Sequence, residues 1–106
     1  MQITTITTDD QGNKRWFNEK GKLHRLGGPA YKGVNGDESW YINGKLHRKD
    51  GPAVRIVGTY TAWYLNDKKH RIDGPAVEWD CGDKEWYVEG VKIKEEIVSD
   101  PIYTNA

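Results

Sequence analysis

The stretch WYINGKLHRKDGPAVRIVGTYTA, residues 40–62, decides the fold, because close copies of it stand on both sides. Each copy begins with a tryptophan, at positions 16, 40, 63 and 86, so the spacings are 24, 23 and 23 residues. Histidine recurs at 24, 47 and 70, and Gly-Pro-Ala recurs at 28–30, 51–53 and 74–76. Three features that share one period identify an internal repeat.

The whole chain, residues 1–106, is predicted to form a single repeat domain. Its parts are an N-terminal capping strand over 1–15, repeats over 16–39, 40–62 and 63–85, and a degenerate C-terminal capping repeat over 86–106. The last part has Val91 and Ile93 where the central repeat has Lys45 and His47, and no Gly-Pro-Ala follows. Terminal repeats that lose the shared pattern are typical of units that close a stack.

The composition favours a small aromatic-rich domain and argues against several function classes. The 106 residues include 16 basic and 16 acidic side chains, five Trp and six Tyr. A zero net charge argues against nucleic-acid binding driven by bulk positive charge, and no dense basic stripe is visible. Cys81 is the one cysteine of the sequence, so an intramolecular disulfide is excluded and a reducing, cytoplasmic compartment is expected. Neither a secretory signal nor an apolar run of about 18 residues is visible.

Strand signals outweigh helix signals in every repeat. Residues 52–57 alternate between apolar and polar, and residues 59–65 contain β-branched and aromatic side chains. Turn residues separate such runs at Asn35-Gly36-Asp37, Gly58-Thr59 and Cys81-Gly82-Asp83, and Asn43-Gly44 makes a second turn after the Trp-aromatic pair. The predicted fold class is therefore all-β, a single elongated antiparallel sheet of stacked β-hairpin repeats of about 23 residues.

Alternation along the strands predicts two different faces of this sheet. Trp40 and Ile42 are expected on one face, so the stacked repeats form a tryptophan ladder there. The opposite face is expected to carry an aromatic ladder with charged neighbours, formed by Phe17, Tyr41, Tyr64, Tyr87, Arg55 and Glu78. We expect the tryptophan ladder to pack inward and the tyrosine face to remain available to a partner.

The two ends of the chain are predicted to complete the sheet. Residues 2–8 are expected to pair with 14–17 across a turn, and 92–98 and 101–103 to form a closing strand or to lie across the tryptophan face. An open sheet has two edges, and edges invite association. A homodimer through an edge or a face is therefore one expected arrangement.

The pattern W-Y-x-N-G-K-x-H-R-x-D-G-P-A resembles a variant of the MORN repeat, a 23-residue hairpin module. The resemblance covers residues 14–90, and the aromatic, Asn-Gly-Lys and histidine positions fit at Trp40, 43–45 and His47. The chain departs from the family after the histidine, where His-Arg-x-Asp-Gly-Pro-Ala replaces the usual His-Gly. This ending is similar to repeats in proteins of bacteriophages, large viruses and bacteria. The resemblance implies a sheet of stacked hairpins, with protein scaffolding or lipid contact as known roles of such modules.

The His-Arg-x-Asp-Gly-Pro box allows two interpretations. In the structural one, Asp50 and Asp73 accept backbone N–H groups at a turn, the glycine permits unusual backbone angles, and His47 packs on a tryptophan or bonds a carbonyl. In the functional one, a ladder holds an anion through His24, Arg25, His47, Arg48, His70 and Arg71. A shared metal is not expected, because equivalent residues of successive hairpins stand roughly 9–10 Å apart while zinc ligands lie at about 2 Å.

Catalysis finds little support in the sequence. It contains no glycine-rich phosphate loop, no His-Glu-x-x-His and no nucleophile elbow. Cys81 lies in a predicted turn without an activating environment. We therefore expect neither an enzyme nor a bound cofactor or metal.

The leading hypothesis is a non-enzymatic module that binds another protein through its aromatic and charged face. The resemblance to phage repeats implies an inhibitor of a host or defence protein as one such function. The first alternative is a small-anion or nucleotide binder, or sponge, that uses the arginine, histidine and aromatic ladders. The second is a structural scaffold or a contact with a membrane surface, although the sequence gives no strong membrane signal.

Overall fold

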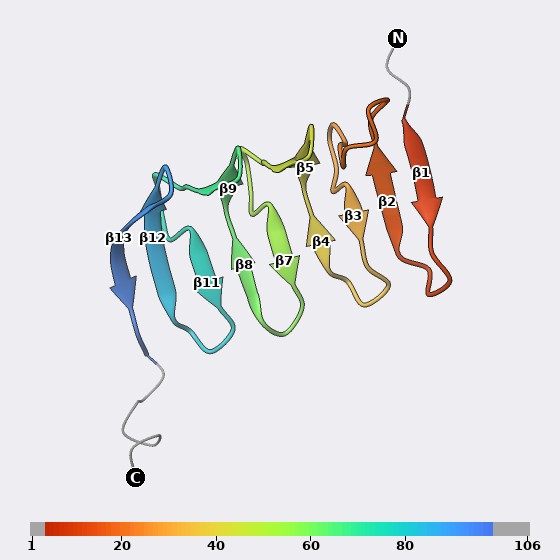
Figure 1. Ribbon diagram of the computed structural model, residues 1–106. Coiled ribbons are helices and arrows are strands. Elements are labelled where there is room, and N and C mark those ends of the chain that lie inside the picture. Colours follow the sequence, from red (N-terminus) through yellow and green to blue (C-terminus); the bar gives the residue numbers. More distant parts are fainter. Residues whose placement is uncertain (1–3, 99–106) are drawn as a thin grey trace.

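The computed structural model describes residues 4–98, and nine strands of this range form one antiparallel sheet (Figure 1). In spatial order the strands are β1 (Thr5–Thr8), β2 (Lys14–Phe17), β3 (Tyr31–Lys32), β4 (Glu38–Ser39), β7 (Val54–Ile56), β8 (Tyr60–Ala62), β11 (Val77–Trp79), β12 (Lys84–Val88) and β13 (Val91–Glu96). The molecule measures 56 × 31 × 18 Å. The predicted fold class, an elongated all-β sheet of stacked hairpins, is confirmed.

Each central repeat also contains a second, shorter hairpin that lies outside the main sheet. These two ribbons are β5 (Tyr41–Ile42) with β6 (Lys45–Leu46), and β9 (Tyr64–Leu65) with β10 (Lys68–Lys69). Figure 1 shows β5 and β9 at the upper ends of the strands of the main sheet, where the connections to the next hairpins leave. Trp40 and Tyr41 were predicted on one strand, but the chain bends between β4 and β5, so the tryptophan closes one hairpin and the tyrosine opens the next.

The predicted turns are present and explain the short ribbons. Asn43 and Gly44 have φ values of 50° and 82°, the left-handed pair that a two-residue hairpin requires. Asn66 and Asp67 adopt the same conformation at 48° and 68° in the next repeat. In the longer hairpins the turn at Gly58 also needs a positive φ, which is 75° there.

The strand register decides which side chains share a face, because directly paired residues point to the same side. One row runs across the sheet through Tyr31, Ser39, Val54, Ala62, Val77 and Glu85. The next row along the strands points to the opposite side and contains charges of both signs, through Lys14, Lys32, Glu38, Arg55, Thr61, Glu78 and Lys84. We call the side of the main sheet to which the first row points, with Tyr31, the Tyr side. The opposite side, to which the second row points, is called the Trp face.

Two predictions about the faces are wrong. Arg55 and Glu78 lie on the Trp face, because β7 pairs with β4 in the register that sets Val54 opposite Ser39. A slip of one residue would reverse every face, and the Gly-Pro-Ala connector fixes the register. The expectation that the tryptophans fill the core also fails, because the buried core consists of small side chains: Ala30, Ala53, Val54, Ala62, Ala76 and Val77.

The ends complete the sheet largely as predicted. Thr5 to Thr8 pair with Lys14 to Phe17, and Val91 to Glu96 pair with β12. Residues 101–103, which were expected to contribute to the closing strand or to lie across the tryptophans, fall outside the described residues. Among residues 4–98 the structure has no helix that is long and apolar enough to cross a membrane.

Candidate functional site

Every tryptophan at the start of a repeat has a cation stacked on its ring. The distances from cation to ring centroid are 4.0 Å for Arg25 on Trp16, 3.8 Å for Arg48 on Trp40, 4.1 Å for Arg71 on Trp63 and 4.5 Å for Lys94 on Trp86. Each such stack contributes about 0.5–2 kcal/mol, depending on how far water is excluded. The indole rings are therefore half-buried under guanidinium or ammonium groups rather than under a second layer of protein.

The Gly-Pro-Ala segment holds each arginine in place. Arg48 donates through Nη1 to the carbonyl oxygen of Pro52 at 3.2 Å and through Nε to Asp50 Oδ1 at 3.2 Å. Arg71 repeats both contacts with Pro75 and Asp73. The aspartates thus accept hydrogen bonds from arginine, and the prediction that they accept backbone N–H groups at the turn is wrong.

The glycine before each proline leaves room for the guanidinium. A Cβ on Gly51 would stand 2.6 Å from Cζ of Arg48, and Gly28 and Gly74 have the same close neighbour in their own repeats. These three glycines are not among the residues with positive φ, so the predicted need for unusual backbone angles is wrong. Their small size, and not their flexibility, is what the repeat uses.

Gly51→Ala is expected to destabilise the protein by about 1 kcal/mol, because the new methyl group displaces Arg48 from Trp40. The same substitution in an Arg48→Ala background should cost little, since nothing then occupies the space. Urea unfolding of the wild type, both single variants and the double variant measures this coupling. Equal costs of Gly51→Ala in both backgrounds would contradict the assignment.

The histidines join neighbouring repeats. Nδ1 of His24, His47 and His70 accepts the backbone N–H of Asn43, Asn66 and Glu89, at 2.9, 3.2 and 2.9 Å. Each acceptor lies in one repeat and each donor in the hairpin turn of the next. His24 is 8% exposed, and its Nε2 is buried without a hydrogen-bond partner among the described residues.

All six residues of the predicted anion ladder are therefore engaged in contacts within the chain. Arg25, which has Gly27 in the place of an aspartate, still donates to the carbonyl oxygen of Pro29 at 3.1 Å. The backbone N–H groups of Arg25, Arg48 and Arg71 donate to the carbonyl oxygens of Tyr41, Tyr64 and Tyr87. His47 was expected to pack on a tryptophan or to bond a carbonyl, but its Nδ1 accepts a backbone N–H of the next repeat. The histidine side chain and the arginine backbone N–H thus join neighbouring repeats, and the arginine side chain bonds within its own repeat.

The predicted aromatic ladder lies on the Tyr side and in the short ribbons. Burial raises the pKa of Tyr41 and of Tyr64 above the usual value for tyrosine, and both rings are only half exposed. Phe17 bridges to Leu23, and Lys69 Nζ lies 4.9 Å from the ring centroid of Tyr87. All four rings are half-buried, so they leave less free surface than was predicted.

Glu85 accepts two side-chain hydrogen bonds on the Tyr side. Its carboxylate accepts a hydrogen bond from Trp79 Nε1 at 2.9 Å and from the Tyr87 hydroxyl at 3.0 Å. The bond from Trp79 is the largest cause that holds the pKa of Glu85 below its usual range. Trp79 also stacks on Tyr60, with 4.9 Å between ring centroids.

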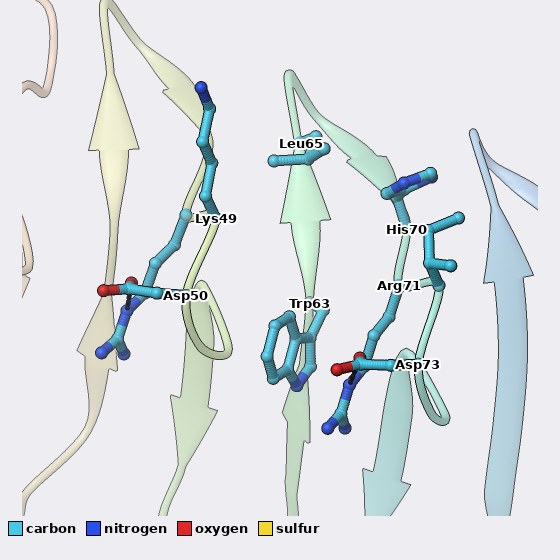
Figure 2. A pocket seen from close by; sticks show the side chains of 9 residues that line it. Lys49, Asp50, Trp63, Leu65, His70, Arg71 and Asp73 are labelled. Atoms are coloured by element: carbon cyan, nitrogen blue, oxygen red, sulfur yellow. Dashed lines mark hydrogen bonds and ion pairs between the residues drawn. The ribbon is translucent and has the colours of Figure 1, made fainter.

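A groove of about 530 Å³ opens on the Trp face between the second and third repeats. Figure 2 shows Trp63 between Asp50 of one repeat and Asp73 of the next. Each aspartate is paired with the arginine two residues before it, so the indole lies between two ion pairs. Ile72, 76% exposed, adds an apolar rim.

The paired cations were missed from the sequence, although a signal exists. Arg48, Arg71 and Lys94 each follow a tryptophan by eight residues, and Arg25 follows by nine. A hairpin with a two-residue turn midway returns the chain to its start, so this spacing brings the cation to the ring. The degenerate last repeat keeps the pattern with Lys94, although it has lost the histidine.

The one cysteine and the possible metal ligands complete the survey of chemically reactive side chains in the part of the chain that the structure describes. Cys81 is exposed, and no three His, Cys, Asp or Glu residues among 4–98 are placed to hold a metal ion. Comparisons with known proteins give no match to a family model, to a curated protein or to a solved structure.

Proposed function

We propose that the protein is a non-enzymatic module that binds another protein through its Trp face. The observation that carries this proposal is the groove at Trp63, where an aromatic floor lies between two arginine–aspartate pairs. Tryptophan and arginine are the residue types most enriched where protein interfaces gain their affinity. An apolar centre with a charged rim is also the usual organisation of such an interface.

The size and charge of this face fit a protein partner. A molecule of 56 × 31 × 18 Å offers a broad side larger than the about 800 Å² that each partner contributes to a standard interface. The row from Lys14 to Lys84 carries both basic and acidic side chains along the sheet. Such a mixture favours a partner surface with charges of both signs.

Of the residues predicted to bind a partner, Arg55 and Glu78 belong to the interface proposed here. The aromatic ladder lies on the other side of the sheet and does not. Arg55 is exposed in the middle of the Trp face, and Glu78 lies 3.4 Å from Arg71 Nη1. Tyr41 and Tyr64 serve the core in this scheme. The resemblance to phage repeats makes a host or defence protein in the cytoplasm the partner class that we propose to test first.

Anion or nucleotide binding is the weaker proposal. In Arg48 and Arg71, Nε and Nη1 already donate hydrogen bonds to the aspartate and to the proline carbonyl of their own repeat. The carboxylate beside each guanidinium would also repel an anion. Calorimetry against a panel of nucleotides distinguishes the two functions. A sponge would bind a nucleotide tightly in the absence of any protein, and we expect no heat of binding.

Ile72→Glu and Arg55→Glu are each expected to weaken partner binding by about tenfold or more, because both change the Trp face without touching the core. Affinity purification from cells that express the protein identifies the partner, and calorimetry with the purified pair gives the dissociation constants.

Val91→Glu is the matched control, since Val91 is 64% exposed beside the turn at Gly90 and outside the groove. Unchanged melting temperatures would show that all three variants are folded. The proposal would be overturned if no protein is retained, or if Ile72→Glu and Arg55→Glu bind the partner as tightly as Val91→Glu does.

A further inference from the structure

The two edges of the sheet differ in their protection against pairing. The closing strand β13 carries charges at Lys92, Lys94, Glu95 and Glu96, which discourage a further strand from adding to it. The opening strand β1 has the sequence Thr-Ile-Thr-Thr, is exposed at every residue and carries no charge. β-branched residues also have high strand propensity. One edge of the sheet is therefore suited to receive another strand.

The main chain of β1 is oriented for this purpose at Ile6. Trp16 is the register partner of Ile6, and it donates its N–H to the carbonyl oxygen of Ala30 at 2.8 Å, on the β3 side. Because the N–H of Trp16 points to β3, it does not bond Ile6 across β1 and β2, so Ile6 and Trp16 form a non-hydrogen-bonded pair of the antiparallel ladder. The N–H and C=O of Ile6 therefore point away from the sheet.

We propose that two copies of the protein pair through β1 in an antiparallel dimer whose two-fold axis passes through Ile6. This axis is perpendicular to the sheet, so the two main sheets become one continuous sheet. Ile6 then lies opposite Ile6 of the second copy, and Thr5 opposite Thr7 of the second copy. The pairing is closed, because it uses the same edge of both copies and leaves the charged β13 edges outside.

The side chains of this register are self-complementary. Ile6 is 56% exposed and points to the same side as Trp16, its register partner. The dimer joins the two isoleucines in one apolar row that ends at a tryptophan on each side. The facing threonines carry no charge, so no like charges meet across β1. A heterologous pairing of β1 with β13 would instead leave a free edge of each kind and grow into an open chain.

The dimer has a consequence for binding that does not depend on which protein is bound. A two-fold axis perpendicular to the sheet keeps both Trp faces on the same side. The paired molecule therefore presents two copies of the groove at Trp63 to one surface, and a partner with two sites would gain by avidity. In this register only Thr5, Ile6 and Thr7 of each β1 face one another, so we expect a reversible association that strengthens with concentration.

Sedimentation velocity over a wide concentration range tests the association. We expect the wild type to shift from monomer to dimer, and Ile6→Lys to remain monomeric at every concentration. Ile93→Lys is the matched control, because Ile93 is 61% exposed on the opposite edge strand, and it should dimerise like the wild type. A monomeric wild type, a dimer that survives Ile6→Lys, or growth beyond the dimer would each overturn the proposal.

Disulfide trapping tests the register and does not depend on how strongly the lysine variants fold. In a Cys81→Ser background, Ile6→Cys places two thiols in a directly opposed pair with Cα atoms about 5.5 Å apart, within disulfide range. Thr7→Cys sets its two thiols on a diagonal, beyond the about 7 Å limit. We expect a covalent dimer from Ile6→Cys alone. Equal trapping of both variants would refute this register, and neither assay involves the groove at Trp63.

Discussion

Replacing Val77 by aspartate is expected to abolish the cooperative fold of the protein. Val77 is 2% exposed and lies between Ala62 and Glu85 in the row that runs across the sheet. A buried carboxylate without a cation beside it costs more than about 4 kcal/mol, which is most of the stability of a small domain. Circular dichroism and urea unfolding should show an unfolded chain under conditions in which the wild type is folded.

Repeat architecture increases this effect. Each repeat contacts only its neighbours, so a defect at Val77 disrupts the pairing of β11 with β8 of the preceding hairpin and with β12 of its own hairpin. Val34→Asp is the matched control, because Val34 is 67% exposed at a hairpin turn near Lys14 and Lys32. We expect its stability to lie within about 0.5 kcal/mol of the wild type. A folded Val77→Asp protein of comparable stability would contradict the location of the core.

The sequence predicts the hairpins of this fold well because local chemistry determines them. Asn43-Gly44 supplies the left-handed turn that two-residue hairpins require, and Gly58 supplies the positive φ of a longer turn. The 23-residue period then stacks equal hairpins in order, so the strand sequence of the main sheet follows without further information. The capping strand at Thr5–Thr8 was predicted by the same rule, from a β-branched run beside a turn.

The faces were not predictable in the same way, because they depend on a connector with no regular structure. Residues 47–53 join the short ribbon to the next long hairpin, and their length sets Trp40 opposite Ala53. Alternation within a strand gives no information on this offset. Arg55 was therefore assigned to the wrong side, although its strand was predicted correctly.

The groove depends on contacts that cross repeat boundaries, which a single repeat does not reveal. Trp63 begins one repeat, whereas Arg48 and Asp50 belong to the repeat before it. The sequence alone left open whether the arginines are free, since nothing in a linear pattern shows that Arg48 lies on Trp40 and bonds Pro52. The need for a small residue before each proline could not be predicted for the same reason, because the neighbour of that glycine is an arginine side chain that folds back over it.

His24→Ala is expected to destabilise the protein by about 1–3 kcal/mol, the second largest effect that we predict. Its Nδ1 accepts the N–H of Asn43 at 2.9 Å in a part-buried setting, so the alanine variant leaves that N–H without an acceptor. Asparagine can place Oδ1 where the histidine has Nδ1, so His24→Asn should recover most of the loss. Urea unfolding of both variants measures the difference.

His70→Ala is the matched comparison, because the equivalent bond to Glu89 has the same length of 2.9 Å but is exposed to water. Water can replace the lost acceptor there, so the cost should be clearly smaller than at His24. His24 also carries a buried Nε2 with no partner among the described residues, and asparagine removes that group. If His24→Asn proved as unstable as His24→Ala, the packing of the ring, and not the hydrogen bond between repeats, would be what the histidine supplies.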